Sequence, residues 1–250
     1  MKAQYAAARS PKYLYDRPSV LRDVLRQGGH MRNRTMKDEP LSDQLKPFVT
    51  RNGWINHPLI VEMPPWRAAQ INRRFAKRAK LAEEFWGKQD YRRYLRLHER
   101  AFRIGALEKV LAVSQPLPDV EIAKLVGEVW IDSENIHQDR GRWRRIWRSL
   151  KSPQSAMSAD DLAALAAQPD PLTVFRGVPH PRHDKLSLSW TTDRDKAISF
   201  ARRSPSETDF ILLTSGQVAK KNIFAYFVSG KESEVVALPR FIRNQKEERI

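Results

Sequence analysis

The pattern of apolar residues changes at Pro171, and this change limits the possible folds more than any other feature of the chain. Between about residues 64 and 168, apolar side chains recur every three or four positions, which is the spacing of amphipathic helices. After Pro171, short runs rich in β-branched and aromatic residues alternate with turn residues, which is typical of strands. A chain that is helical first and strand-rich afterwards is predicted to be an α+β protein.

Capping residues and prolines set the expected boundaries of these elements. The expected helices are a block opening at Pro64-Pro65, Asp90–Val113, Asp119–Val126, a helix from Asp132 or Ser133 to Leu150, Ser158–Gln168, and one capped by Asp193. The expected strands are Leu172–Phe175, Leu186–Thr191, Phe210–Val218, Asn222–Phe227 and Glu234–Leu238. Three regions follow: residues 1–60, irregular apart from a short helix near 19–27; a helical region, 61–157; and a strand-rich core, 158–250.

Positive charge is concentrated in the first three-fifths of the chain. Residues 1–150 hold 30 Lys and Arg against 17 Asp and Glu, whereas residues 151–250 hold 15 against 12. The formal net charge of the whole chain is +16. A field of this sign favours acidic partners, namely nucleic acid, an acidic protein surface or an anionic cofactor, without choosing among them.

Composition excludes several classes of protein. The chain has no Cys, which excludes a disulfide framework, a thiolate metal site and a thiol nucleophile. An apolar fraction of 41% is too high for a disordered chain. We find neither a secretory signal nor an apolar run of the roughly 20 residues needed to span a bilayer. The expectation is therefore a cytoplasmic protein with no membrane partner.

Three short motifs in the last eighty residues carry candidate chemistry. Arg176-Gly177 follows a predicted strand, where a guanidinium can hold phosphate or carboxylate and the glycine allows close approach of a ligand. Hydroxyl residues alternate along Leu186–Thr192 and can orient a carboxylate or a ribose. Glu232 and Glu234 lie two residues apart, so a strand would direct both to one side. Each motif by itself is also compatible with an ordinary solvated strand or cap.

The order of these motifs resembles the mono-ADP-ribosyltransferase superfamily, in its Arg–Ser–Glu class of cholera-like toxins, arginine-specific vertebrate enzymes and bacteriophage transferases. The resemblance rests on Arg176, on Ser189-Trp190-Thr191 followed by a helix, and on Glu232-Ser233-Glu234. It covers about residues 172–240. Members of that superfamily usually have Ser-Thr-Ser at the position where this chain has Ser-Trp-Thr. We expect Trp190 to lie in the core. The implied fold is a small split β-sandwich behind a basic helical N-terminal region.

The resemblance also implies roles for these residues, with NAD as substrate rather than redox cofactor. Glu234 would stabilise the positively charged ribose, and Ser189 would orient Glu234. Arg176 would contact the phosphates or a ribose, with Thr191 also in the NAD site, and the backbone of Gly177 would receive the nicotinamide amide. Glu232 would face the acceptor.

A Glu at position 232 accompanies arginine modification in the family, because a carboxylate can hold a guanidinium through two hydrogen bonds. The expected acceptor is therefore an arginine-bearing or acidic host protein, as for a phage effector in the host cytoplasm. Two alternatives stay open, which are ADP-ribosylation of nucleic acid and a non-catalytic nucleic-acid-binding protein using the basic residues 1–150. Hydrolysis of NAD by water is a further alternative.

Other basic and histidine-rich segments allow two interpretations each. The helix Arg140–Arg148 could line the NAD cleft, dock the acceptor or bind nucleic acid, but Trp143 and Trp147 could equally pack inward and leave a solvated basic face. The basic block Arg73–Lys80 is likewise a phosphate-binding or a solvated face. His180 and His183 lie in a proline-containing segment, with no carboxylate or Cys partner at helical spacing, so we expect no metal.

Overall fold

The computed structural model describes residues 39–62, 67–113, 117–133, 136–179, 187–203, 210–228 and 233–250. The chain divides into two compact units, residues 1–99 and residues 100–250. The helix expected near residues 19–27 lies outside the described residues, as do His180, His183 and Glu232. Within the part that is described, no helix combines the length and the apolar character needed to cross a membrane.

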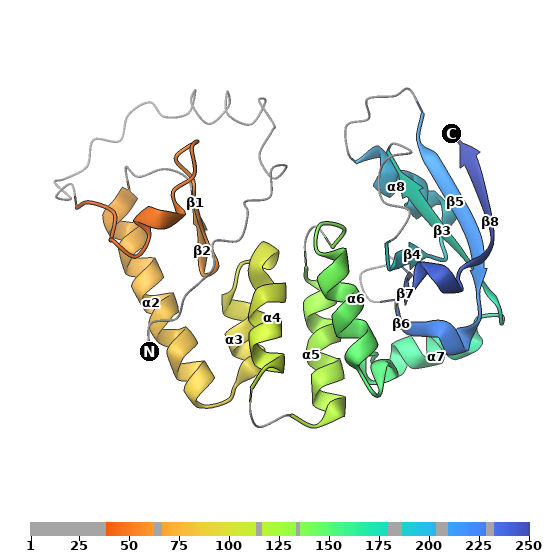
Figure 1. Cartoon of the computed structure of the whole chain (residues 1–250), viewed down its shortest axis with the longest axis horizontal. Coiled ribbons are helices and arrows are strands. Elements are labelled where there is room, and N and C mark those ends of the chain that lie inside the picture. Colours follow the sequence, from red (N-terminus) through yellow and green to blue (C-terminus); the bar gives the residue numbers. More distant parts are fainter. Residues whose placement is uncertain are drawn as a thin grey trace. The chain divides into compact units, whose positions relative to one another are not determined.

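Unit 1 combines a β-hairpin with two helices (Figure 1). Its elements are η1 (Lys46–Phe48), β1 (Ile55–His57), β2 (Ile60–Glu62), α2 (Ala68–Gly87) and α3 (Tyr91–Leu97). The antiparallel hairpin β1–β2 was not expected from the sequence, because three-residue strands give too few positions for an alternating pattern.

The hairpin also explains a second difference from the sequence expectation. A single helix over Asp90–Val113 was predicted, but α3 ends at Leu97 and His98 takes an extended conformation. The next residue, Glu99, donates its backbone N–H to Pro58 O at 2.8 Å, so the loop of the hairpin captures the backbone there. The start of the predicted helix is confirmed, since Asp90 caps α3 by accepting from Arg93 N.

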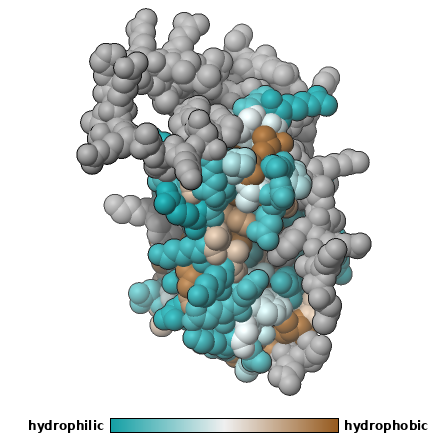
Figure 2. Space-filling view, turned by 90° about the vertical axis from the view of Figure 1, so that its left-hand side faces the viewer, coloured by the Kyte–Doolittle hydropathy of each residue, from teal (hydrophilic) through white to brown (hydrophobic). Residues whose placement is uncertain are grey.

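The basic face of α2 is solvent-exposed in unit 1. Arg73, Arg74 and Lys77 are exposed, while Ile71 and Phe75 are buried on the other side of the helix. Arg74 pairs with Glu62, and Arg78 pairs with Glu99. Figure 2, which views the molecule from the left-hand side of Figure 1, shows mainly hydrophilic described residues with scattered apolar areas. This arrangement agrees with the solvated-face interpretation of the Arg73–Lys80 block.

A buried histidine lies at the centre of unit 1. His57 is 7% exposed, and its ring makes edge contacts with Phe48 and Phe75 at centroid distances of 4.4 and 4.8 Å. Its Nδ1 accepts a hydrogen bond from Leu59 N at 3.0 Å, which requires the neutral ring with its proton on Nε2. Burial, with a further contribution from nearby His98, lowers the pKa of His57 to about 4. His57 is therefore a neutral core residue.

Unit 2 places helices beside one six-stranded antiparallel sheet (Figure 1). Its helices are η3 (Arg100–Phe102), α4 (Arg103–Leu111), α5 (Asp119–Ile131), α6 (Arg140–Ser149), η4 (Pro153–Ala156), α7 (Ala159–Ala167), α8 (Arg194–Arg202), η5 (Lys220–Asn222) and η7 (Pro239–Phe241). Its strands are β3 (Leu172–Val178), β4 (Ser189–Thr191), β5 (Leu212–Val218), β6 (Ile223–Phe227), β7 (Glu234–Ala237) and β8 (Arg243–Arg249). The α+β class predicted from the sequence is confirmed.

Two helical boundaries in unit 2 differ from those expected. A helix was predicted to start at Asp132 or Ser133, but these residues close α5, and α6 begins at Arg140. The carboxylate of Asp132 pairs with Arg100 and Arg103, while Ser133 Oγ donates to Val129 O. Both side chains are therefore used to terminate a helix rather than to cap the next one. Helix α5 also runs on to Ile131, five residues beyond the expected end at Val126.

The predicted helix start at Ser158 is confirmed in detail. Ser158 and Asp161 form a reciprocal capping box at the start of α7. Asp161 is 3% exposed, and its second oxygen accepts from Val228 N at 2.9 Å. The cap of α7 therefore also fixes the end of β6, just before the segment that precedes Glu234.

Tryptophans form the core between the helices of unit 2 and the sheet. Trp130, Trp143 and Trp147 are at most 1% exposed, and the ring of Trp130 meets both others edge-on. Trp147 in turn stacks on Phe224 of β6 with an interplanar angle of 16°. The inward packing of Trp143 and Trp147 is thus confirmed. It fixes α6 against the edge strand of the sheet.

Candidate functional site

Arg176 bridges the two strands at the middle of the sheet. The strand order is β6-β7-β4-β3-β5-β8, and β3 and β4 share a single register pair, Phe175 with Thr191. Beyond this pair, Arg176 Nη1 donates to Ser189 O at 2.8 Å. The half-buried guanidinium therefore joins β3 to β4 where regular backbone pairing is sparse.

Ser189 and Glu234 meet across the next strand pair. In the β4–β7 register, Thr191 faces Glu234 and Ser189 faces Val236. Because alternate residues share a face, Ser189 and Glu234 are diagonal neighbours on one side of the sheet. Ser189 Oγ donates a hydrogen bond to Glu234 Oε1 at 2.5 Å. Both side chains are half-buried, so an oriented carboxylate lies close to solvent.

The three sequence-predicted residues Arg176, Ser189 and Glu234 are thus brought together from β3, β4 and β7. Glu234 follows Arg176 by 58 positions in the sequence, but only one strand, β4, separates their strands in the sheet. Ser189 connects them, since its carbonyl accepts from the arginine and its hydroxyl donates to the carboxylate. Two separate hydrogen bonds of Ser189, one to its backbone carbonyl and one from its hydroxyl, therefore hold a cation and a carboxylate on either side of it, and these residues form the Arg176–Ser189–Glu234 chain.

Thr191 lies beside this chain but serves the turn into α8. It is 3% exposed, and its hydroxyl accepts from Asp193 N at 3.1 Å. Asp193 then caps α8, accepting from the backbone of Lys196 and Asp195. The hydrogen bond from Lys196 N–H is the main cause of a lowered pKa for Asp193. The hydroxyl of Thr191 therefore helps to position the helix that follows the serine strand.

Gly177 is required by helix packing in this structure. A Cβ atom at this position would lie 2.0 Å from Ala197 O and 3.0 Å from Ala201 Cβ. Helix α8 therefore approaches β3 so closely that only glycine fits between them. The resemblance implies a role for the Gly177 backbone in binding a ligand, but the packing of α8 is sufficient to explain why this residue has no side chain.

The backbone immediately before Glu234 is held in an unusual conformation. Ser233 has φ of 47°, in the left-handed region that non-glycine residues rarely adopt. Its carbonyl accepts from Thr192 N at 3.1 Å, which ties the approach to β7 to the end of β4. Such strained positions cluster at functional sites. No strand or helix pattern in the sequence could have indicated this conformation.

Further polar residues of the hydroxyl-rich segment Leu186–Thr192, together with Tyr226, surround the site. Ser187 Oγ accepts from Ser189 N at 3.3 Å, and Ser187 O accepts from Trp190 Nε1 at 3.2 Å. Trp190 is 3% exposed, which confirms its expected place in the core. Thr192 Oγ1 lies 3.4 Å from Tyr226 OH. The alternation of serines before Trp190 was the one available signal for Ser187.

The described residues contain no group of three or more His, Asp or Glu side chains placed to hold a metal ion. Comparison with known proteins adds no assignment. The chain matches no protein-family model, and no curated protein or solved structure is similar enough to it to count as a match. The function must therefore be argued from the geometry of the site and from the motif resemblance.

Proposed function

We propose that the protein is an NAD-dependent mono-ADP-ribosyltransferase acting on a macromolecule, with protein arginine as the acceptor. The observation that carries the proposal is the hydrogen bond from Ser189 Oγ to Glu234 Oε1, with Arg176 bound to the same serine. The resemblance implies that Ser189 orients Glu234, and this hydrogen bond would do so. The bond depends on strand register, which the short motifs alone do not contain.

The sheet also supports the proposal. Strands β6-β7-β4 and β3-β5-β8 are each paired over several residues, while the two triplets are joined at the single pair Phe175–Thr191. A sheet that is weakly paired at its middle is what a split β-sandwich requires. Arg176, Ser189 and Glu234 all lie on the strands that border this weak pairing.

In the proposed reaction the bond between nicotinamide and ribose C1′ breaks, and its electron pair leaves with nicotinamide. Positive charge then develops on the ribose ring, and the carboxylate of Glu234 stabilises it. The guanidine nitrogen of the acceptor forms the new bond to C1′ and loses a proton. The products are the ADP-ribosylated acceptor, nicotinamide and a proton.

The neighbouring residues act by orienting these groups. Ser189 fixes the rotamer of Glu234 through the 2.5 Å hydrogen bond, so no reorientation is needed as charge develops. Arg176 is held on the other side of Ser189, and a guanidinium in this position suits the phosphates of NAD. By the resemblance, the Gly177 backbone would receive the carboxamide and Glu232 would face the acceptor. Thr191, which the resemblance also puts in the NAD site, is 3% exposed and would act only by positioning the turn into α8.

The test is transfer of label from adenine-labelled NAD to a cytosolic extract by the full chain. Wild type is compared with Glu234→Gln, which keeps the shape and removes the charge, and with Glu248→Gln as matched control. Glu248 lies on the edge strand β8, paired with Arg194 at the exposed surface. We expect protease-sensitive label that falls at least about 100-fold in Glu234→Gln and is unchanged in the control.

Other outcomes separate the alternatives. Nuclease-sensitive label would move the acceptor from protein to nucleic acid, which the basic residues 1–150 would suit. Free ADP-ribose without labelled macromolecule would make the protein an NAD hydrolase. Absence of both label and released nicotinamide from folded wild-type protein, across several extracts, would overturn the proposal and favour a non-catalytic nucleic-acid-binding protein.

A further inference from the structure

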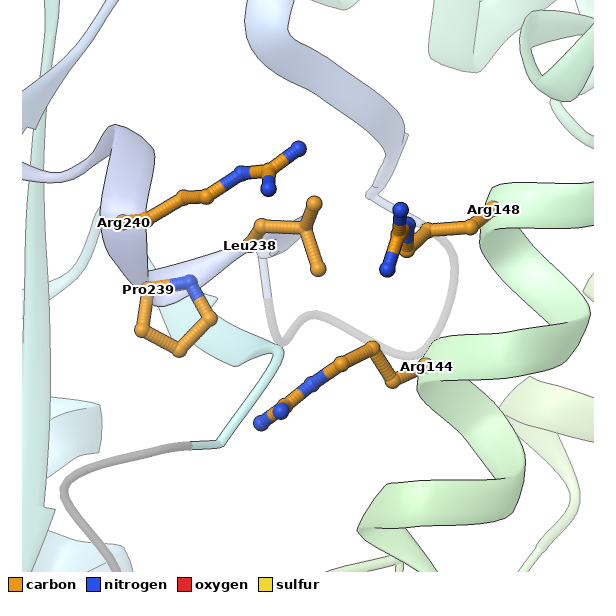
Figure 3. A pocket seen from close by; sticks show the side chains of 5 residues that line it. All are labelled: Arg144, Arg148, Leu238, Pro239 and Arg240. Atoms are coloured by element: carbon orange, nitrogen blue, oxygen red, sulfur yellow. The ribbon is translucent and has the colours of Figure 1, made fainter.

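A small basic pocket lies between helix α6 and the η7 turn of unit 2 (Figure 3). Its volume is about 200 Å³. Its described lining consists of three arginines and two apolar residues, Arg144, Arg148, Arg240, Leu238 and Pro239. Leu238 is 4% exposed and lies between Arg144 on one side and Arg148 and Arg240 on the other. Three cations therefore surround one small cavity, and no carboxylate belongs to the described lining.

Packing of α6 fixes the first two arginines. Arg144 and Arg148 are four positions apart and so lie on one face of the helix. The adjoining face is anchored by buried Trp143 and Trp147, and the latter stacks on Phe224 of the sheet. The helix cannot rotate without disrupting this core. The packing of α6 therefore fixes the backbone of both arginines near the end of β7, so little backbone ordering is needed when a ligand binds.

The third arginine comes from the other side of the pocket. Arg240 follows Pro239 in the η7 turn, and its guanidinium carbon lies 4.8 Å from the ring centre of Phe241. This cation–π contact restricts the side chain. In Figure 3, Arg240 and Arg148 extend toward each other above Leu238, while Arg144 extends below it. Side chains from two separate elements thus converge on the pocket.

A neighbour on α6 shows a different environment for an arginine. Arg142 makes hydrogen-bonded ion pairs with Glu108 and Asp139 at 2.6 and 3.0 Å, and the bond to Glu108 is the main cause of its raised pKa. These acids lie on the side of α6 that meets α4, away from Arg144 and Arg148. In Figure 3 the guanidiniums of Arg148 and Arg240 extend toward each other, and a bound anion would offset their mutual repulsion.

We propose that the Arg144–Arg148–Arg240 pocket is a binding site for a phosphate group. Planar guanidinium forks match phosphate oxygens through paired hydrogen bonds. A pocket of about 200 Å³ encloses a phosphate or pyrophosphate group rather than a whole dinucleotide. The phosphate can come from a free phosphate compound or from the backbone of a nucleic-acid strand. This inference does not depend on the proposed transferase activity.

The test measures binding by the full chain at low salt to two probes, inorganic pyrophosphate and a short single-stranded RNA. Wild type is compared with the double variant Arg148→Gln/Arg240→Gln. The matched control is Arg145→Gln, on the same helix but outside the pocket lining, with its side chain 74% exposed. We expect the double variant to bind at least about tenfold more weakly and the control to match wild type.

Each outcome has a defined meaning. If the double variant loses binding of pyrophosphate but not of RNA, the pocket is a site for free phosphate compounds. If it loses binding of RNA but not of pyrophosphate, the phosphate comes from a nucleic-acid backbone. Failure of both probes to bind wild type, or equal loss in the Arg145 control, overturns the proposal. The variant Arg148→Lys/Arg240→Lys keeps both charges but cannot form paired hydrogen bonds, so it should bind more weakly than wild type and more tightly than the double glutamine variant. Circular dichroism of each variant excludes unfolding as the cause of lost binding.

Discussion

In unit 1 the hydrogen-bonded polar ring of His57 is enclosed between Phe48 and Phe75, whereas in unit 2 the chain Arg176–Ser189–Glu234 is only half-buried. Both sets of polar groups have partners. They differ in what surrounds them, since aromatic rings exclude water from the first and the sheet leaves the second close to solvent. A polar group enclosed in this way contributes to folding, while one that is oriented and accessible can meet a ligand.

The largest effect is expected at Gly177. Here the half-buried site of unit 2 depends, like the enclosed histidine of unit 1, on close packing, because α8 lies directly against this residue of β3. Gly177→Ala places a Cβ against the backbone of α8, so strand or helix must shift. We expect a loss of about 3 kcal/mol in the free energy of unfolding, measured by urea denaturation. Gly141→Ala is the control, because a Cβ there meets nothing within 4 Å. Equal stability of the two variants would contradict the close packing of α8.

A smaller effect is expected at Ser189, and it should fall on activity rather than stability. Ser189→Ala removes the hydrogen bond that orients Glu234. Transfer from NAD should fall about 10- to 100-fold, while the unfolding free energy changes by less than about 1 kcal/mol because the hydroxyl is half-buried. Ser189→Thr retains a hydroxyl and should recover part of the activity. If Ser189→Ala unfolds the protein and spares transfer per folded molecule, the half-buried chain is structural, as in unit 1.

The smallest effect concerns the enclosed histidine of unit 1. Its folded pKa of about 4 lies below the usual 6.5, so the neutral ring stabilises the fold above pH 6.5. That contribution is lost as pH falls from 6.5 toward 4. Between pH 7 and pH 5.5 we expect wild type to lose about 1 kcal/mol more than His57→Gln, which does not titrate. The full chain is measured by urea denaturation, and identical pH dependence of the two proteins would show that His57 is not enclosed.

Much of the fold of unit 2 could be predicted from local sequence. The capping box at Ser158, the cap at Asp193 and the strands β3, β5, β6 and β7 follow from side chains that act within a few residues of themselves. Strand β8 could not be predicted. All seven of its residues are exposed, and it carries no apolar alternation, so its place depends on backbone pairing with β5.

The helical regions show the same limit. Asp132 and Ser133 carry the side chains of a helix cap, yet here they terminate α5 because Arg100 and Arg103 bind the aspartate. The helix over Asp90–Val113 is broken where Glu99 reaches Pro58. In both cases a partner distant in the sequence competes with a local preference. Helix ends are therefore less well determined by sequence than helix interiors.

For the candidate site, too, some features follow from local sequence and others only from tertiary structure. The sequence by itself determined the residue types, namely an arginine, a serine and a glutamate on or beside strands, and placed Trp190 in the core. Only the tertiary structure decided that Ser189 donates to Glu234, that α8 requires Gly177 to be a glycine, and that Arg240 joins Arg144 and Arg148 at one pocket. The physical reason is that side-chain type and local spacing are properties of neighbouring residues, whereas strand register and helix packing are set by burial summed over the whole core.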